Sequence, residues 1–97
     1  MEKKYTAFTD TLLEAILTLK SVEECYNFFE DICTVKEIQE MSQRFQVAME
    51  LRKGNNYQMI SKMTGASTAT ISRVNRCLMY GNGGYNQVLD KMEEDYE

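Results

Sequence analysis

Residue types that carry enzyme and metal chemistry are missing from this 97-residue chain or scarce in it. It has no histidine and three cysteines, Cys25, Cys33 and Cys77, so a zinc site with the usual four Cys or His ligands is not expected. Without histidine, no nucleophile–base pair occurs at a plausible spacing. The Gly-Asn-Gly-Gly segment at 81–84 has no predicted strand before it and no lysine after it, unlike a phosphate-binding loop. We therefore expect no enzyme, no metal and no cofactor.

Long apolar runs are also missing. No run approaches the roughly 20 residues that cross a bilayer, and the N-terminus lacks the apolar core of an export signal. An odd cysteine count without such a signal indicates reduced thiols, which we expect to be buried as small apolar side chains. The sequence thus predicts a cytoplasmic protein with no membrane partner. Because 43% of the residues are hydrophobic in so short a chain, some apolar surface should remain exposed in a monomer, which favours an oligomer.

Proline is absent and strand-like alternation is scarce, so the periodicity is helical throughout. It predicts one all-α domain over residues 1–97, with helices at about 3–20, 22–32, 35–53, 57–64, 68–79 and 85–94. Ser21–Glu24 and Thr34–Glu37 are capping boxes. Gly54 suits a left-handed helix end, and Ser67 suits an N-cap. We divide the domain into N-terminal helices in 1–33, a core helix in 34–54, a helix-turn-helix in 55–80 and a C-terminal helix in 85–97.

Acidic residues are absent between positions 51 and 89. This acid-free segment has a formal charge of +5, whereas residues 1–50 have −5 and residues 90–97 have −4. Its bases are Arg52, Lys53, Lys62, Arg73 and Arg76. A basic segment inside an acidic protein predicts that one surface binds a polyanion while the rest avoids it.

The acid-free segment also has the pattern of a helix-turn-helix. Its first helix offers Ile60 and the small Ser61 where the second helix would cross, and Gly65 tolerates the turn. Ile71 and Val74, three residues apart, are the predicted inner side of the second helix. Ala66 is small where the turn folds in, and the predicted outward residues are Thr68, Ala69, Ser72, Arg73, Asn75 and Arg76.

The outward residues suit double-stranded DNA. Thr68 and Ala69 are short enough to let the backbone approach base edges, and the amides after Ser67 lie at the positive end of the helix dipole. We predict contacts to bases from Ser67, Thr68, Ala69, Ser72 and Arg73. We predict phosphate contacts from Arg76, Lys62, Lys53 and Arg52.

A second hypothesis is open at this point. Two short helices around a glycine also occur in all-α proteins that never touch DNA. The basic surface would then bind an acidic protein, and the chain would be an interaction or assembly module without specific DNA recognition. Binding that ignores DNA sequence, together with a preferred protein partner, would distinguish the two hypotheses.

Three segments give the chain a resemblance to a known family. They are Met41-Ser-Gln-Arg44, Leu51-Arg-Lys-Gly54 and the run from Thr64-Gly-Ala to Ser72-Arg-Val74. Over residues 34 to about 92 the chain resembles the Trp repressor superfamily, above all its small members from Gram-positive bacteria. The resemblance implies a six-helix subunit and an intertwined homodimer held by the N-terminal helices. It also implies a transcriptional regulator, of repressor type, that places two recognition helices on a palindromic operator.

The resemblance further implies a corepressor pocket. The arginines on either side of the tryptophan that the family binds correspond to Arg44 and Arg73, and two threonines near it to Thr34 and Thr70. Val74 departs from the pattern, because the repressor has a glycine there that leaves room for the indole ring. A serine near the ligand's amino group is replaced by Cys77. Since the valine would occupy the volume of the ring, we expect a corepressor smaller than tryptophan, or none.

Overall fold

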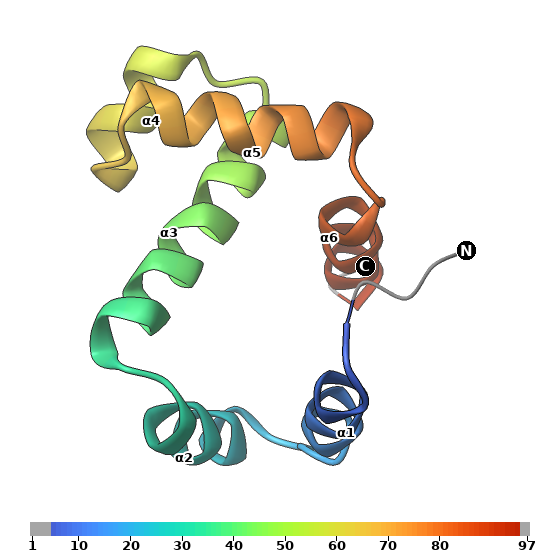
Figure 1. Cartoon of the computed structure of the whole chain (residues 1–97). Helices are drawn as coiled ribbons and strands as arrows, with labels where there is room; N and C mark the ends of the chain where they lie inside the picture. The colour runs from blue at the N-terminus through green and yellow to red at the C-terminus, as the bar shows by residue number, and fades with distance from the viewer. Residues whose placement is uncertain (1–4, 96–97) are drawn as a thin grey trace. The chain divides into compact units, whose positions relative to one another are not determined.

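The computed structural model describes residues 5–95, and within them it contains six α-helices and no strand (Figure 1). The all-α, six-helix prediction is confirmed. The helices are α1 (Ala7–Ile16), α2 (Val22–Ile32), α3 (Val35–Arg52), α4 (Tyr57–Thr64), α5 (Thr68–Tyr80) and α6 (Gly84–Asp95). Over these residues, no helix combines the length and the apolar character that a membrane crossing needs.

Helix α1 is shorter than the predicted 3–20, of which residues 3 and 4 lie outside the described part. After Ile16 the backbone tightens, because Thr18 N–H donates to Ala15 O and Leu19 N–H to Ile16 O, each over three residues. The Thr18 hydroxyl also donates to Ala15 O at 2.6 Å. The apolar spacing continues through Leu19 although the helix has ended.

Hydrogen bonds at the capping boxes explain where α2 and α3 begin. Ser21 Oγ accepts from Glu24 N–H at 3.1 Å. At the start of α3 the box closes in both directions: Glu37 N–H donates to Thr34 Oγ1 at 3.1 Å, and Thr34 N–H donates to Glu37 Oε1 at 2.8 Å. Hydrogen bonds from the backbone and the hydroxyl of Thr34 hold the pKa of Glu37 below its ordinary value.

The chain forms two compact units, residues 1–38 and 39–97, and α3 contributes residues to both. In the first unit neither α1 nor α2 has a buried residue. Large apolar side chains there are exposed, Phe8 and Leu17 by 87% and 84%. The others are Tyr5, Leu13, Val22, Tyr26, Ile32 and Val35.

The second unit contains the hydrophobic core. Helix α5 packs against α4 and α6, and its predicted inner residues Ile71 and Val74 are buried, as is Ile60 of α4. The remaining buried apolar residues are Val47, Ala48, Ala66 and Leu89. Gly54 and Gly65 have the predicted left-handed backbone, with φ of 90° and 75°.

Candidate nucleic-acid interface

Helices α4 and α5 form a helix-turn-helix whose ends are capped by side chains. Asn56 Oδ1 accepts from Met59 N–H at 2.8 Å at the start of α4. Ser67 Oγ accepts from Thr70 N–H at 3.1 Å at the start of α5, as predicted. Because each cap satisfies a backbone donor of the first helical turn, the start of both helices is well defined.

Side chains of α4 also fix the turn between the two helices. Ser61 Oγ donates to Ala66 O at 2.8 Å. Ser61 was predicted only as a small residue at the helix crossing, and its hydroxyl also holds the turn. The Thr64 hydroxyl donates to Ile60 O at 2.7 Å and accepts from Ala66 N–H at 3.1 Å. Gln43 Nε2 of α3 donates to Thr64 O at 3.2 Å, which ties the turn to the core helix.

Helix α5 presents most of the predicted DNA-contacting residues to solvent. Thr68, Ala69, Arg73 and Arg76 are exposed and Ser67 is exposed before them, whereas Ser72 and Asn75 are half-buried. Across residues 5–95, no ion pair joins Arg73, Arg76 or Lys62 to a carboxylate. These three cations therefore remain available to an external anion.

A hollow of about 610 Å³ lies where the first turn of α4 meets the start of α5. Its lining brings together Lys62, a predicted phosphate contact, and Thr68, a predicted base contact. The rest of the lining is Asn56, Tyr57, Gln58, Met59 and Ser61. The sequence pattern did not single out Tyr57, Gln58 or Met59. These residues lie near Thr68 only because the chain turns sharply at Gly65.

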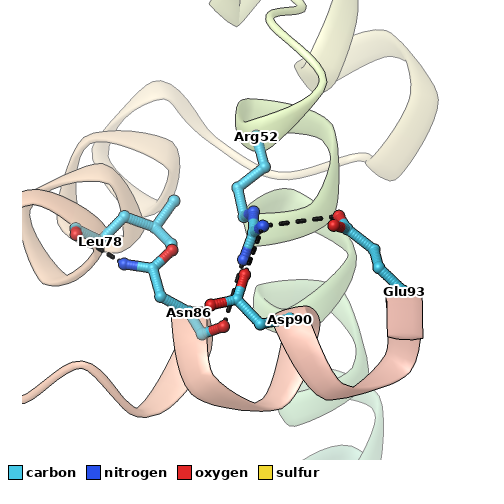
Figure 2. Close-up of polar contacts among 5 residues, drawn as sticks. All are labelled: Arg52, Leu78, Asn86, Asp90 and Glu93. Atoms are coloured by element: carbon cyan, nitrogen blue, oxygen red, sulfur yellow. Dashed lines mark hydrogen bonds and ion pairs between the residues drawn. The ribbon is translucent and has the colours of Figure 1, made fainter. Parts of the chain in front are cut away.

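The predicted phosphate contact of Arg52 is not supported, because its guanidinium is engaged within the protein (Figure 2). Its Nη2 lies 2.8 Å from Asp90 Oδ1 and 3.4 Å from Glu93 Oε1, and its Nη1 donates to Asn86 O at 3.2 Å. Asn86 Nδ2 in turn donates to Leu78 O of α5 at 3.1 Å. Arg52 therefore joins the end of α3 to α6, and the acidic C-terminal segment supplies its partners.

Lys53 has a partner as well, in a network that the sequence did not indicate. Glu50 of α3 is only 2% exposed and accepts hydrogen bonds from Gln46 Nε2 at 2.9 Å, Asn55 Nδ2 at 2.8 Å and Lys53 Nζ at 3.4 Å. Burial raises the pKa of Glu50, but Gln46, Lys53 and Asn55 together lower it below the ordinary value. The lysine side chain remains 59% exposed, so it can still approach a phosphate.

The sequence matches one protein family over nearly its whole length. Residues 8–93 fit the family described as Trp repressor protein. The chain belongs to the Trp repressor family. YerC of Bacillus subtilis is 58% identical over 85 residues, which make up 88% of this chain and 82% of YerC. The match confirms the resemblance stated for residues 34–92 and extends it to the N-terminal helices.

Solved structures agree with this family assignment. A TrpR-like protein from Eubacterium eligens has a TM-score of 0.88 and 53% identity, covering 91% of either chain. A candidate Trp repressor from Staphylococcus aureus has a TM-score of 0.88 and 54% identity, covering 92% of this chain and 89% of the other. The Trp repressor family is one of DNA-binding regulators, so the α4–α5 unit is the helix-turn-helix of such a protein.

Three of the residues carried over from the family's corepressor pocket have structural roles in this Trp repressor family member. Val74 is 1% exposed and packs in the core with Ile60 and Ile71. Thr34 caps α3, and Thr70 accepts from Ser67 Oγ. Arg44 is half-buried and Arg73 is exposed.

The cysteines differ from their predicted burial. Cys77 is exposed, and Cys25 and Cys33 are only half-buried, all three with free thiols. Cys77 borders a hollow of about 460 Å³ with Phe45 and Tyr85 among its lining. Among the side chains described, which are those of residues 5–93, no three His, Cys, Asp or Glu groups gather so as to hold a metal ion.

Proposed function

We propose that this Trp repressor family member is a sequence-specific transcriptional repressor that binds a palindromic operator in double-stranded DNA as a homodimer. The observation that carries the proposal is the exposed, acid-free surface of the α4–α5 unit, where Arg73, Arg76 and Lys62 have no carboxylate partner among the described residues. A surface of this kind neutralises phosphates without competition from the protein's own acids.

The proposed contacts divide by chemistry. Thr68 and Ala69 lie in the first turn of α5, where short side chains let a helix sit deep in the major groove and touch base edges. Ser67, Ser72 and Arg73 complete the proposed base contacts. Arg76, Lys62 and Lys53 are the proposed phosphate contacts, which hold the protein in register on the duplex without selecting sequence.

The homodimer is supported by the first unit. Helices α1 and α2 bury none of their residues, and Phe8 and Leu17 are among their most exposed apolar side chains. Covering a side chain of this size gains about 1.5–3 kcal/mol. Two copies would cover these helices and place two α5 helices on the half-sites of a palindrome.

The corepressor, if one is required, is proposed to be smaller than tryptophan. The resemblance places Val74 where the family leaves room for the indole ring, and its side chain is buried in the core cluster that also contains Ile60 and Ile71. Arg44, Thr70, Arg73 and Cys77, all in the second unit, remain the candidate contacts of a smaller ligand. Thr34, which the resemblance also implies, lies in the first unit.

Selection from a randomised duplex library at near-physiological salt tests the proposed function. We expect enrichment of a palindrome whose half-sites lie about one helical turn apart. Selection would be repeated with added amino acids to test for a corepressor. Retention without enrichment under all these conditions, combined with a preferred acidic protein in a pull-down, would instead support the interaction-module hypothesis.

Two variants of α5 test the division of roles. Arg76→Ala should weaken binding to every sequence about equally and lower the salt-dependence slope of the dimer by about two, because each protomer loses one phosphate contact. Thr68→Ala should change the preferred base at one position of each half-site, at a cost of about 1–3 kcal/mol for the original base. Equal weakening across all sequences in both variants would contradict the assignment.

A further inference from the structure

Glu50 is the one charged side chain that is buried among the residues the structure describes. A buried carboxylate is costly unless donors surround it, and this one has donors on both oxygens. Asn55 Nδ2 donates to Oε1 at 2.8 Å, while Gln46 Nε2 at 2.9 Å and Lys53 Nζ at 3.4 Å donate to Oε2. A buried hydrogen-bond network in which every acceptor has a donor is rigid. It therefore restrains the segments from which its members come.

The network holds the turn that leads into the helix-turn-helix. The backbone N–H of Asn55 donates to Glu50 O at 3.2 Å, so both the main chain and the side chain of Asn55 are bound by Glu50. The next residue, Asn56, caps α4 through Met59 N–H. Glu50 is therefore bonded to the turn that joins the end of α3 to the cap of α4.

The same carboxylate restrains a proposed DNA contact. Lys53 is a proposed phosphate contact, and its ammonium is held at Glu50 although the side chain is 59% exposed. The residues that follow the restrained turn, from Asn56 to Met59, line the hollow that also contains Lys62 and Thr68. Displacing the turn would thus move several groups of the interface together.

We propose that Glu50 is a positioning residue of the DNA interface: it touches no DNA, but it fixes the start of α4 and the ammonium of Lys53 in the geometry that binds the operator backbone. The inference rests on the proposed function for its DNA part. It goes beyond that function because Glu50 is a buried acidic residue, whereas the proposed function assigns roles only to exposed basic and small polar residues.

The sign of the effect separates this role from simple electrostatics. Glu50→Gln removes a negative charge near a polyanion site, which by charge alone should strengthen DNA binding. A positioning role predicts the opposite, because the amide keeps one acceptor oxygen and its NH2 group opposes the donors on the other side, either Asn55 or Gln46 with Lys53. Substitutions that act through intervening residues can change the coupling between sites about 2–30-fold, and we expect Glu50→Gln to weaken operator binding within that range.

The first experiment compares operator affinity over a salt series for wild type, Glu50→Gln and Glu93→Gln. The control removes the same charge from a side chain that is 69% exposed on α6, outside the proposed DNA contacts and the helices proposed to dimerise, and should bind equally well or slightly more tightly. Base preference should not change in Glu50→Gln, since no base contact is altered. Affinity equal to or above that of wild type in Glu50→Gln would overturn the proposal.

A rescue variant tests the hydrogen bond itself. Asn55→Asp sets two carboxylates against each other and should also weaken binding. The double variant Glu50→Gln with Asn55→Asp exchanges donor and acceptor, so it should recover most of the affinity that either single variant loses. Additive losses in the double variant would count against the positioning role.

Amide hydrogen exchange gives a readout that needs no DNA. In Glu50→Gln, exchange at the capped Met59 amide should accelerate about tenfold while exchange at Ile71 and Val74 stays unchanged, which is local opening. The double variant should restore the slower rate. Equal acceleration at Met59, Ile71 and Val74 would mean general destabilisation and would overturn the proposal. A wild-type protein that selects no DNA sequence would refute the proposed function, while the exchange data would still decide whether Glu50 holds the turn.

Discussion

At the scale of single residues, Glu37 and Glu50 show how hydrogen bonds link stability to pH. Thr34 holds the pKa of Glu37 below the ordinary value of 4.5, and for Glu50 the effect of burial is outweighed by Gln46, Lys53 and Asn55. A carboxyl group whose folded pKa is lowered stabilises the fold at pH values above its unfolded pKa. That contribution disappears as the pH falls through the folded pKa.

We therefore expect the free energy of unfolding to be flat with respect to these two groups near neutral pH and to fall below about pH 4.5. Urea denaturation at a series of pH values measures it. Glu50→Gln should make the acid branch shallower. A steeper acid branch in Glu50→Gln would contradict a lowered pKa for this carboxyl group.

Val74 gives a second prediction at this scale. Because its side chain is 1% exposed and packs in the core, Val74→Ala should lower the free energy of unfolding by about 2 kcal/mol. Tryptophan at millimolar concentration should neither raise the melting temperature of wild type nor tighten its operator binding. Saturable heat on titrating wild type with tryptophan would show that the ring fits after all. Cys77→Ser, on the exposed side of α5, is the control for stability.

At the scale of elements, the turn between α4 and α5 depends on one glycine. Gly65 has φ of 75°, and a Cβ placed there would meet only Gln43 Nε2 at 3.9 Å, an ordinary contact. The cost of Gly65→Ala therefore comes from the backbone alone and should be about 1–2 kcal/mol. Gly65→Asn should cost less, because asparagine tolerates the left-handed region. Thermal unfolding of the two variants checks the order, and an equal loss would point to crowding instead.

Helices whose ends carry capping residues or glycines could be predicted from the sequence. The end of α1, which has neither, could not. Caps and glycines placed the ends of α2 to α5 within a residue or so, because Ser21, Thr34 and Ser67 bond to neighbours three residues away. Helix α1 ended early, since the bonds over three residues after Ile16 leave no mark in the apolar spacing.

The candidate interface divides in the same way. Helical periodicity was enough to place Ile71 and Val74 inward and Thr68 outward. The role of Glu50 depends on Asn55, which contacts it after the turn that follows α3. The pairing of Arg52 with α6 depends on Asp90, which lies 38 positions further along the chain. An acidic or basic residue considered alone is expected to be solvated. The roles of Glu50 and Arg52 could therefore be found only from the structure.

At the scale of the whole molecule, the exposed apolar helices predict association. Phe8 of α1 is 87% exposed, and Phe8→Glu should raise the dissociation constant of the proposed homodimer at least about tenfold, since a lost apolar side chain is worth more than 1.4 kcal/mol. Thr11→Glu adds the same charge to an exposed position of the same helix and should have a smaller effect. Sedimentation equilibrium measures both, and equal shifts would mean that charge, not apolar contact, governs association.

Two helices without a single buried residue also have a consequence for gene control. If α1 and α2 become covered only when two chains meet, then at low abundance the species that occupies an operator grows with the square of the chain concentration. A cell that doubles the amount of this regulator would raise the active species about fourfold in that regime. The response of the controlled genes to the protein's own synthesis would then be steeper than any single binding site permits.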